Sequence, residues 1–96
     1  MDLEVLMEVF DVIEDRRKHP KPKSYVNKMM SSGLEDILKK ISEEATELTI
    51  SAGGSDKEAI VHETADVIFH LMILLAYKRI SLADVLDELR KRRTKR

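Results

Sequence analysis

Apolar residues along this chain recur at spacings of three and four positions, and no useful length alternates with period two. Spacings of three and four place side chains on one face of an α-helix, whereas alternation would indicate a strand. The pattern therefore predicts an all-α fold, arranged as an antiparallel helical bundle, with residues 1–96 forming one domain. We expect helices at about residues 2–17, 24–31, 34–52 and 56–77, and a last helix from residue 82.

Prolines, glycines and capping residues mark the ends of these helices. Pro20 and Pro22 end the first helix, because proline cannot continue a helix and biases the preceding residue towards extended conformations. Gly33 suits the left-handed position that closes the short second helix. Ser55, with Glu58 three residues later, is a capping box that predicts the start of the long helix at residues 56–77.

The segment at residues 67–77 is apolar nearly all the way round a helix. A helix of that kind must be covered on every side. A chain of this size buries only about 60 to 70% of the surface that its unfolded form exposes, so it would be marginally stable alone. A second copy of the chain is the simplest partner that could cover this helix, and we therefore expect a homodimer. Eleven residues are fewer than the roughly 18 that span a bilayer, so we expect no membrane association.

Charge and composition narrow the function class. Seventeen basic residues balance eighteen acidic ones, for a net charge of −1, which disfavours nucleic acid as a partner. The basic stretch at residues 90–96 is better explained by attraction to the end of the last helix. The chain has no cysteine, so any metal must be held by oxygen or imidazole. Without cysteine or a visible secretion signal, we expect a cytoplasmic protein.

Acidic residues border the predicted core on two consecutive helices. On the helix at residues 34–52, Glu44 and Glu47 lie about 60° and 120° from the centre of the apolar stripe. On the next helix, Glu63 and Asp66 lie on a narrow polar stripe opposite the apolar residues. Like charges at i, i+3 are unfavourable unless something positive lies between them. Two such pairs facing each other predict a site for a hard cation, Mg²⁺ or Mn²⁺.

Other polar residues lie near these pairs. Lys40, one turn ahead of Glu44, would add positive charge, and since Mg²⁺ pairs readily with phosphates we expect a polyphosphate substrate. Glu43 falls near the solvent face and could support the site from outside. A histidine within an apolar helical segment, as His70 is, is more often a hydrogen-bonded core residue than a metal ligand. We assign no role to His62. A single acid pair on a helix is usually only a solvated surface, and that interpretation stays open.

Two acidic motifs carry a resemblance to a known superfamily. Residues 39–47 read KKISEEATE and residues 63–66 read ETAD, which resembles the Glu-Glu-x-x-Glu and Glu-x-x-Asp signature of the all-α nucleoside triphosphate pyrophosphohydrolases. Within it, the stretches SYVNKMM at 24–30 and ADVIFHLMILL at 65–75 resemble the phosphoribosyl-ATP pyrophosphohydrolase family. The similarity covers residues 3–92. Ser42 is a departure, because relatives commonly carry glycine there.

The resemblance implies a homodimer that hydrolyses phosphoribosyl-ATP, a small-molecule nucleotide, to phosphoribosyl-AMP and pyrophosphate. This is the second step of histidine biosynthesis, and it implies Mg²⁺ as cofactor. Glu43 or Glu47 would orient the attacking water as general base, and the residues alone do not choose between them. The implied metal ligands are Glu44, Glu47, Glu63 and Asp66. The implied substrate-binding residues are Lys40, Lys28, Tyr25 and Ser24.

Two other functions stay open at this point. A house-cleaning pyrophosphohydrolase of the same superfamily would use the same acids but would prefer ordinary nucleoside triphosphates. A non-catalytic helical interaction module would use the acids as a solvated face and the basic tail as its contact surface, and it would not bind Mg²⁺. The stretches at residues 24–30 and 65–75 favour the histidine-pathway activity.

Overall fold

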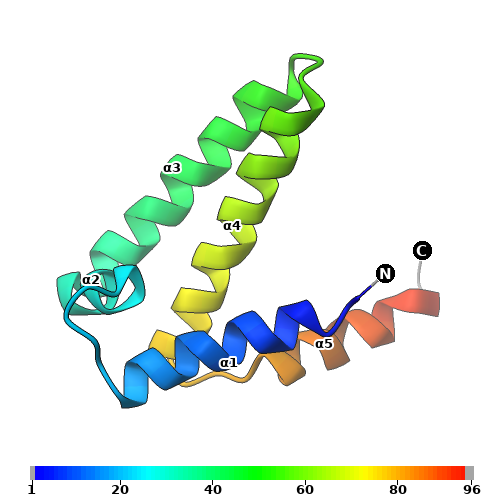
Figure 1. The fold of residues 1–96 in the computed structure, drawn as a ribbon. Coiled ribbons are helices and arrows are strands. Elements are labelled where there is room, and N and C mark those ends of the chain that lie inside the picture. Colours follow the sequence, from blue (N-terminus) through cyan, green and yellow to red (C-terminus); the bar gives the residue numbers. More distant parts are fainter. Residues whose placement is uncertain (1, 95–96) are drawn as a thin grey trace.

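The computed structural model describes residues 2–94 of the chain, and within that range every regular element is a helix (Figure 1). This confirms the all-α prediction. The elements are α1 (Val5–Lys18), α2 (Tyr25–Ser32), α3 (Leu34–Ala52), α4 (Lys57–Tyr77), α5 (Leu82–Lys91) and the 3₁₀ turn η1 (Arg92–Thr94).

The two longest helices, α3 and α4, lie side by side as a hairpin (Figure 1). The short helix α2 packs against the beginning of α3 and also contacts α4 and α1. Helix α1 packs against α4, and in Figure 1 it crosses the end of α4 that lies farthest from the hairpin turn. The end of the hairpin near the turn therefore extends beyond the packed helices.

The core lies where α1, α2, α3 and α4 meet. Its most deeply buried large side chains are Ile13, Ile37 and Ile73, one from each of the three longer helices. Leu3 falls within the helix expected at residues 2–17 and was expected on its apolar face, but it is 70% exposed. The helix begins only at Val5, so Leu3 lies outside the helical face that the spacing assumes.

The start of α4 differs from the predicted capping box by one residue. Asp56, rather than Ser55, is the N-cap, and its Oδ1 accepts a hydrogen bond from the backbone N–H of Ala59 at 3.2 Å. A carboxylate caps a helix at least as well as a hydroxyl and also interacts favourably with the positive end of the helix dipole. The prediction that Ser55 pairs with Glu58 is therefore wrong, although the helix itself is where we expected it.

Gly33 is the single residue between the end of α2 at Ser32 and the start of α3 at Leu34. Its φ of 96° is positive, as predicted, but its ψ of 174° lies outside the left-handed helical region. Glycine is essentially the only residue that adopts this extended, positive-φ conformation without cost. Its carbonyl accepts a hydrogen bond from the N–H of Ile37 at 3.2 Å, so the residue that ends α2 also begins α3.

Helix α4 leaves part of its apolar surface uncovered. Val61, Ile68 and Leu71 are 58%, 41% and 42% exposed. The whole helix, unlike residues 67–77 alone, is long and apolar enough to cross a membrane by length and composition, and 22% of its most apolar 18-residue window is buried. One such helix is weak evidence for a membrane span, because core helices of soluble proteins meet the same criterion.

Basic residues at the end of α5 and the start of η1 pair with acidic residues of α5. Arg90 pairs with Asp87, while Lys91 Nζ and Arg92 Nη2 lie 3.8 Å and 3.5 Å from carboxylate oxygens of Glu88. These pairs agree with a structural role at the helix end. Residues 95 and 96 of the expected tail lie outside the described residues.

Candidate metal and catalytic site

Glu44 on α3 is a buried carboxylate, with 5% of its surface exposed. Its Oε1 accepts a hydrogen bond from Lys40 Nζ, one turn earlier on the same helix, at 3.1 Å. Its Oε2 is buried and has no hydrogen-bond partner among residues 2–94. A buried carboxylate oxygen without a partner is costly, so this atom is suited to a positively charged ligand.

Lys40 keeps Glu44 ionised despite burial. Burial is the largest influence on the pKa of Glu44 and raises it, but the hydrogen bond and the charge of Lys40 together lower the pKa below its ordinary value. In return, the hydrogen bond to Glu44 raises the pKa of Lys40. The two side chains therefore form a charged pair at the edge of the core.

Glu47 and Glu63 bring further carboxylates to Glu44. Each of the three residues offers an oxygen within 4.8 Å of the others. The Oε2 of Glu63 is also buried, again without a hydrogen-bond partner in the described part of the chain. Burial, together with the charges of Glu47 and Glu44, raises the pKa of Glu63. The charged form of this group is therefore disfavoured until a cation is present.

Asp66 joins the same site through Glu63. Ligand atoms of His62, Glu63 and Asp66 also lie within 4.8 Å of one another, and His62 Nε2 is 3.2 Å from Asp66 Oδ2. The structure thus brings the four acids that the sequence paired into one continuous cluster, which we call the acid cluster. His62 was given no role from the sequence, although its spacing of four residues from Asp66 was the available signal.

A hydrogen-bonded chain connects the start of α2 to α4 beside the acid cluster. Tyr25 Oη lies 2.7 Å from His70 Nε2, and His70 Nδ1 lies 2.7 Å from the backbone oxygen of Asp66. Because a carbonyl only accepts, Nδ1 carries the proton and Nε2 of the neutral ring accepts from the tyrosine hydroxyl. Burial raises the pKa of Tyr25, which keeps its hydroxyl as the donor. His70 is thus the hydrogen-bonded core histidine that the sequence favoured.

The remaining candidates lie outside the acid cluster. Ser24 caps α2, and its Oγ accepts a hydrogen bond from the N–H of Asn27 at 3.3 Å. Lys28 and Glu43 line a hollow of about 270 Å³ between α2 and α3, and Lys40 borders the same hollow. Lys40 therefore lies between the hollow and Glu44. Ser42, the departure from the family pattern, is exposed on α3.

These residues form a donor set for a hard divalent cation. All four acids offer oxygen, the ligand that Mg²⁺ and Mn²⁺ prefer. The two buried oxygens without partners, Oε2 of Glu44 and Oε2 of Glu63, fit a bound cation because neither accepts a hydrogen bond within residues 2–94. Next to the cluster, the lysines of the hollow suit phosphate groups. The arrangement is suited to chemistry on a metal-bound polyphosphate.

Comparison with known proteins gives a consistent result over nearly the whole chain. Residues 6–93 match the phosphoribosyl-ATP pyrophosphohydrolase family. The chain is 44% identical over 92 residues to the phosphoribosyl-ATP pyrophosphatase of Clostridium acetobutylicum, covering 96% of this chain and 84% of that protein. Identity to the phosphoribosyl-ATP pyrophosphatase of Bacillus mycoides is 46% over 92 residues, with coverage of 96% and 86%.

A longer relative is the histidine biosynthesis bifunctional protein HisIE of Thermoanaerobacter pseudethanolicus. It is 46% identical over 84 residues, which cover 88% of this chain but 39% of that protein. The present chain therefore matches one part of a bifunctional protein and most of the length of the shorter relatives.

Proposed function

This chain belongs to the phosphoribosyl-ATP pyrophosphohydrolase family, and we propose from this premise that it hydrolyses the α–β phosphoanhydride of phosphoribosyl-ATP. The products are phosphoribosyl-AMP and pyrophosphate, and the reaction belongs to histidine biosynthesis. The observation that carries the proposal is the acid cluster itself, in which two buried carboxylate oxygens have no partner among residues 2–94. A cytoplasmic location goes with this biosynthetic role.

Mg²⁺, or Mn²⁺ in its place, is the proposed cofactor. When bound, the cation neutralises phosphate charge and stabilises the charge that develops on the departing pyrophosphate. Support comes from the all-oxygen donor set and from the raised pKa of Glu63 in its absence. The proposed ligands are Glu44, Glu47, Glu63 and Asp66.

The lysines beside the acid cluster bind and orient the triphosphate in this proposal. Lys40 remains charged because its hydrogen bond to Glu44 raises its pKa, and it borders both the acid cluster and the hollow. Lys28 and Lys39 line the same hollow and add positive charge where the phosphates would lie. Tyr25 acts differently, because its hydroxyl is already donated to His70. We assign it the role of holding α2 against the site.

Glu47 is the proposed general base. It is exposed, and one of its oxygens lies within the acid cluster, whereas Glu43 lies in the lysine-lined hollow outside it. A water molecule positioned by Glu47 transfers a proton to that carboxylate while its oxygen attacks the phosphoanhydride, and pyrophosphate leaves. Glu43 then has the smaller task of balancing the charge of Lys39 and Lys40.

A second copy of the chain completes the antiparallel helical bundle in this proposal. The uncovered apolar residues Val61, Ile68 and Leu71 on α4 are surface that such a copy would bury. A membrane is a poor alternative cover, because the same helix carries Glu63 and Asp66, and charged groups are expensive in hydrocarbon. We therefore propose a homodimer with α4 at its interface.

Substituting single acids tests the proposed reaction. We expect Glu44→Gln or Asp66→Asn to lower pyrophosphate release from phosphoribosyl-ATP by roughly 100-fold or more and to weaken Mg²⁺ binding in calorimetry. Circular dichroism should show unchanged helical content. Glu35→Gln, which removes an exposed acid from the first turn of the same helix, should leave both measurements as in the wild type.

Three results would contradict the proposal. Near-normal turnover in Glu44→Gln would remove the acid cluster from the mechanism. A preference of the wild type for ordinary nucleoside triphosphates over phosphoribosyl-ATP would indicate a house-cleaning enzyme. Absence of Mg²⁺ binding, both with and without a triphosphate, would indicate a helical interaction module.

A further inference from the structure

Arg79 has an unusual backbone conformation. It is the one non-glycine residue with positive φ, 60°, in the range 2–94. It follows the end of α4, where the N–H of Ile80 bonds to the carbonyl of Leu75 at 2.9 Å and its own N–H bonds to the carbonyl of Ala76 at 3.1 Å. Glycine is the favoured residue at this left-handed position of the Schellman motif. Arginine there carries a conformational cost, which a function of its side chain would explain.

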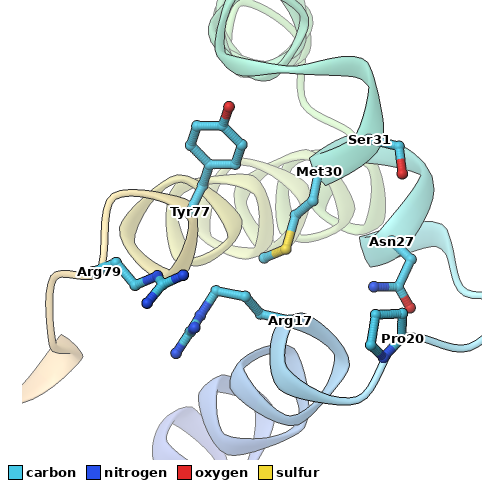
Figure 2. Close-up of a pocket in the computed structure, with 7 residues that line it drawn as sticks. All are labelled: Arg17, Pro20, Asn27, Met30, Ser31, Tyr77 and Arg79. Atoms are coloured by element: carbon cyan, nitrogen blue, oxygen red, sulfur yellow. The ribbon is translucent and has the colours of Figure 1, made fainter.

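The side chain of Arg79 lies at a cavity of about 510 Å³, separate from the lysine-lined hollow. Arg79 and Arg17 both line this cavity, and in the view of Figure 2 their guanidinium groups lie on the same side of it. Polar groups of Ser31 and Tyr77 also line it, and its described lining includes no carboxylate. Two guanidinium groups that line one cavity without a carboxylate in its lining favour an anionic ligand there.

Arg17 is held in position before any ligand binds. Its Nε and Nη2 both donate to Glu14 Oε2, the first at 3.1 Å, and this leaves Nη1 for another acceptor. The adjacent wall of the cavity is also braced. Asn27 Nδ2 donates to the backbone oxygen of Arg16 at 2.7 Å, and Asn27 Oδ1 accepts from the N–H of Lys21 at 2.8 Å.

Three donors of the cavity are not engaged within the protein. The guanidinium of Arg79 and the hydroxyls of Ser31 and Tyr77 have no hydrogen-bond partner in the part of the chain that the structure describes. Glu14 compensates Arg17, whereas Arg79 has no ion-pair partner among residues 2–94, so the lining of the cavity carries a net positive charge. In Figure 2 the hydroxyls of Tyr77 and Ser31 point away from the two guanidinium groups, so the arginines are the groups that would hold an oxyanion here.

We propose that this cavity, between Arg17 and Arg79, binds the phosphate monoester group of a small molecule. A planar guanidinium matches two phosphate oxygens, and Arg17 keeps Nη1 available beside the guanidinium of Arg79 for this purpose. The space is larger than one phosphate group requires, and Met30 and the ring of Tyr77 offer apolar contact to the carbon skeleton that carries it. We call it the arginine cavity.

The monoester has two conceivable sources. Phosphoribosyl-ATP carries a phosphate monoester on its added ribose, which ordinary nucleoside triphosphates lack, and this source rests on the proposed function. Tyr77 follows Asp66 by eleven residues on α4, about 16 Å along the helix, so the arginine cavity and the acid cluster would hold opposite ends of such a substrate. The other source is a separate sugar phosphate.

Titration of the full-length protein with ribose 5-phosphate, followed by NMR, tests the site directly. We expect saturable shifts of the amide signals of Arg17, Ser31 and Arg79, and none with ribose. Arg79→Gly removes the guanidinium while supplying the residue favoured at positive φ, so it should fold and should weaken binding at least about tenfold. Lys78→Gln removes a neighbouring charge outside the cavity and should bind as the wild type does.

Steady-state kinetics of Arg79→Gly distinguish the two sources. If the substrate itself supplies the monoester, KM for phosphoribosyl-ATP rises about tenfold with kcat unchanged, and KM for ATP does not change. If a separate sugar phosphate is the ligand, KM is unchanged although ribose 5-phosphate binding is lost. Absence of saturable shifts in the arginine cavity, or equally tight binding by Arg79→Gly, overturns the proposal. Glu44→Gln should retain ribose 5-phosphate binding, so failure of one proposal is distinguishable from failure of the other.

Discussion

Glu63 illustrates how the surroundings of a single side chain can reduce the stability of the metal-free protein. Its carboxylate is placed where burial and the charges of Glu47 and Glu44 all disfavour ionisation. For an acid, a raised pKa in the folded state means that the protonated form stabilises the fold. The metal-free protein therefore loses this contribution as the pH rises through the pKa of Glu63.

Neutralising Glu63 should stabilise the metal-free protein. We expect Glu63→Gln to raise the Tm by a few degrees in the presence of a chelator, because the repulsion from Glu47 and Glu44 is removed. Added Mg²⁺ should raise the Tm of the wild type but not of the variant. Differential scanning calorimetry with chelator and with Mg²⁺ makes both comparisons. Glu58→Gln, at the exposed start of the same helix, should give no increase, and a lower Tm for metal-free Glu63→Gln would refute the explanation.

The hydroxyl of Tyr25 should matter for stability. Tyr25→Phe leaves Nε2 of the buried His70 without its donor, which should cost about 1 to 2 kcal/mol in the free energy of unfolding. Urea denaturation measures the change. Tyr77→Phe is a matched control, because that hydroxyl has no partner within residues 2–94, and equal losses in the two variants would argue against the Tyr25 to His70 hydrogen bond.

Residue spacing predicted the acid cluster well but could not predict its surroundings. Glu44, Glu47, Glu63 and Asp66 lie on faces that helical periodicity determines, and one tight turn brings those faces together. The contact between Tyr25 and His70 joins residues 45 positions apart and has no periodic signal. Such contacts depend on how α2 packs, which local patterns do not encode.

At the scale of the helices, the apolar spacing located each element and local chemistry determined where it ends. The differences at Leu3 and at Ser55 arise because capping and fraying depend on individual side chains rather than on periodicity. Gly33 differs in a similar way. Its positive φ could be predicted from residue type, whereas its ψ depends on the direction in which α3 leaves α2.

Gly33 offers a test of this junction between helices. A Cβ at position 33 would meet no atom within 4 Å, so any cost of Gly33→Ala comes from the backbone conformation alone. We expect a loss of about 1 to 3 kcal/mol in the free energy of unfolding, measured by urea denaturation. Gly54→Ala should be nearly neutral, because φ there is not positive and the added Cβ meets only Ser51 O, at 3.6 Å. A neutral Gly33→Ala would show that the junction tolerates another geometry.

At the scale of the whole molecule, the structure leaves α4 exposed on one side while its other side carries the acid cluster. The sequence predicted that another part of the protein or a second copy must pack against this helix, because residues 67–77 are apolar on nearly every side. It could not predict the arginine cavity. Arg17 and Arg79 are 62 positions apart and line one cavity only because α1 crosses the end of α4.

A charge on the uncovered side of α4 should separate the proposed dimer. We expect Ile68→Glu to run as a monomer in size-exclusion chromatography with light scattering, at concentrations where the wild type is a dimer, because a buried unpaired carboxylate is costly. Lys23→Glu, in the loop between α1 and α2, adds an acid outside this face and should remain dimeric. A monomeric wild type at tens of micromolar would contradict the assignment of this surface.

In the proposed dimer, α4 would form the interface between subunits and also carry Glu63 and Asp66, two of the four acids of the acid cluster. If dimerisation fixes the position of these carboxylates, the turnover per molecule rises with the concentration of the protein. Cells that contain little of the protein then obtain disproportionately little turnover from it. Flux through the pathway would then respond to expression more steeply than in proportion, without any dedicated regulator.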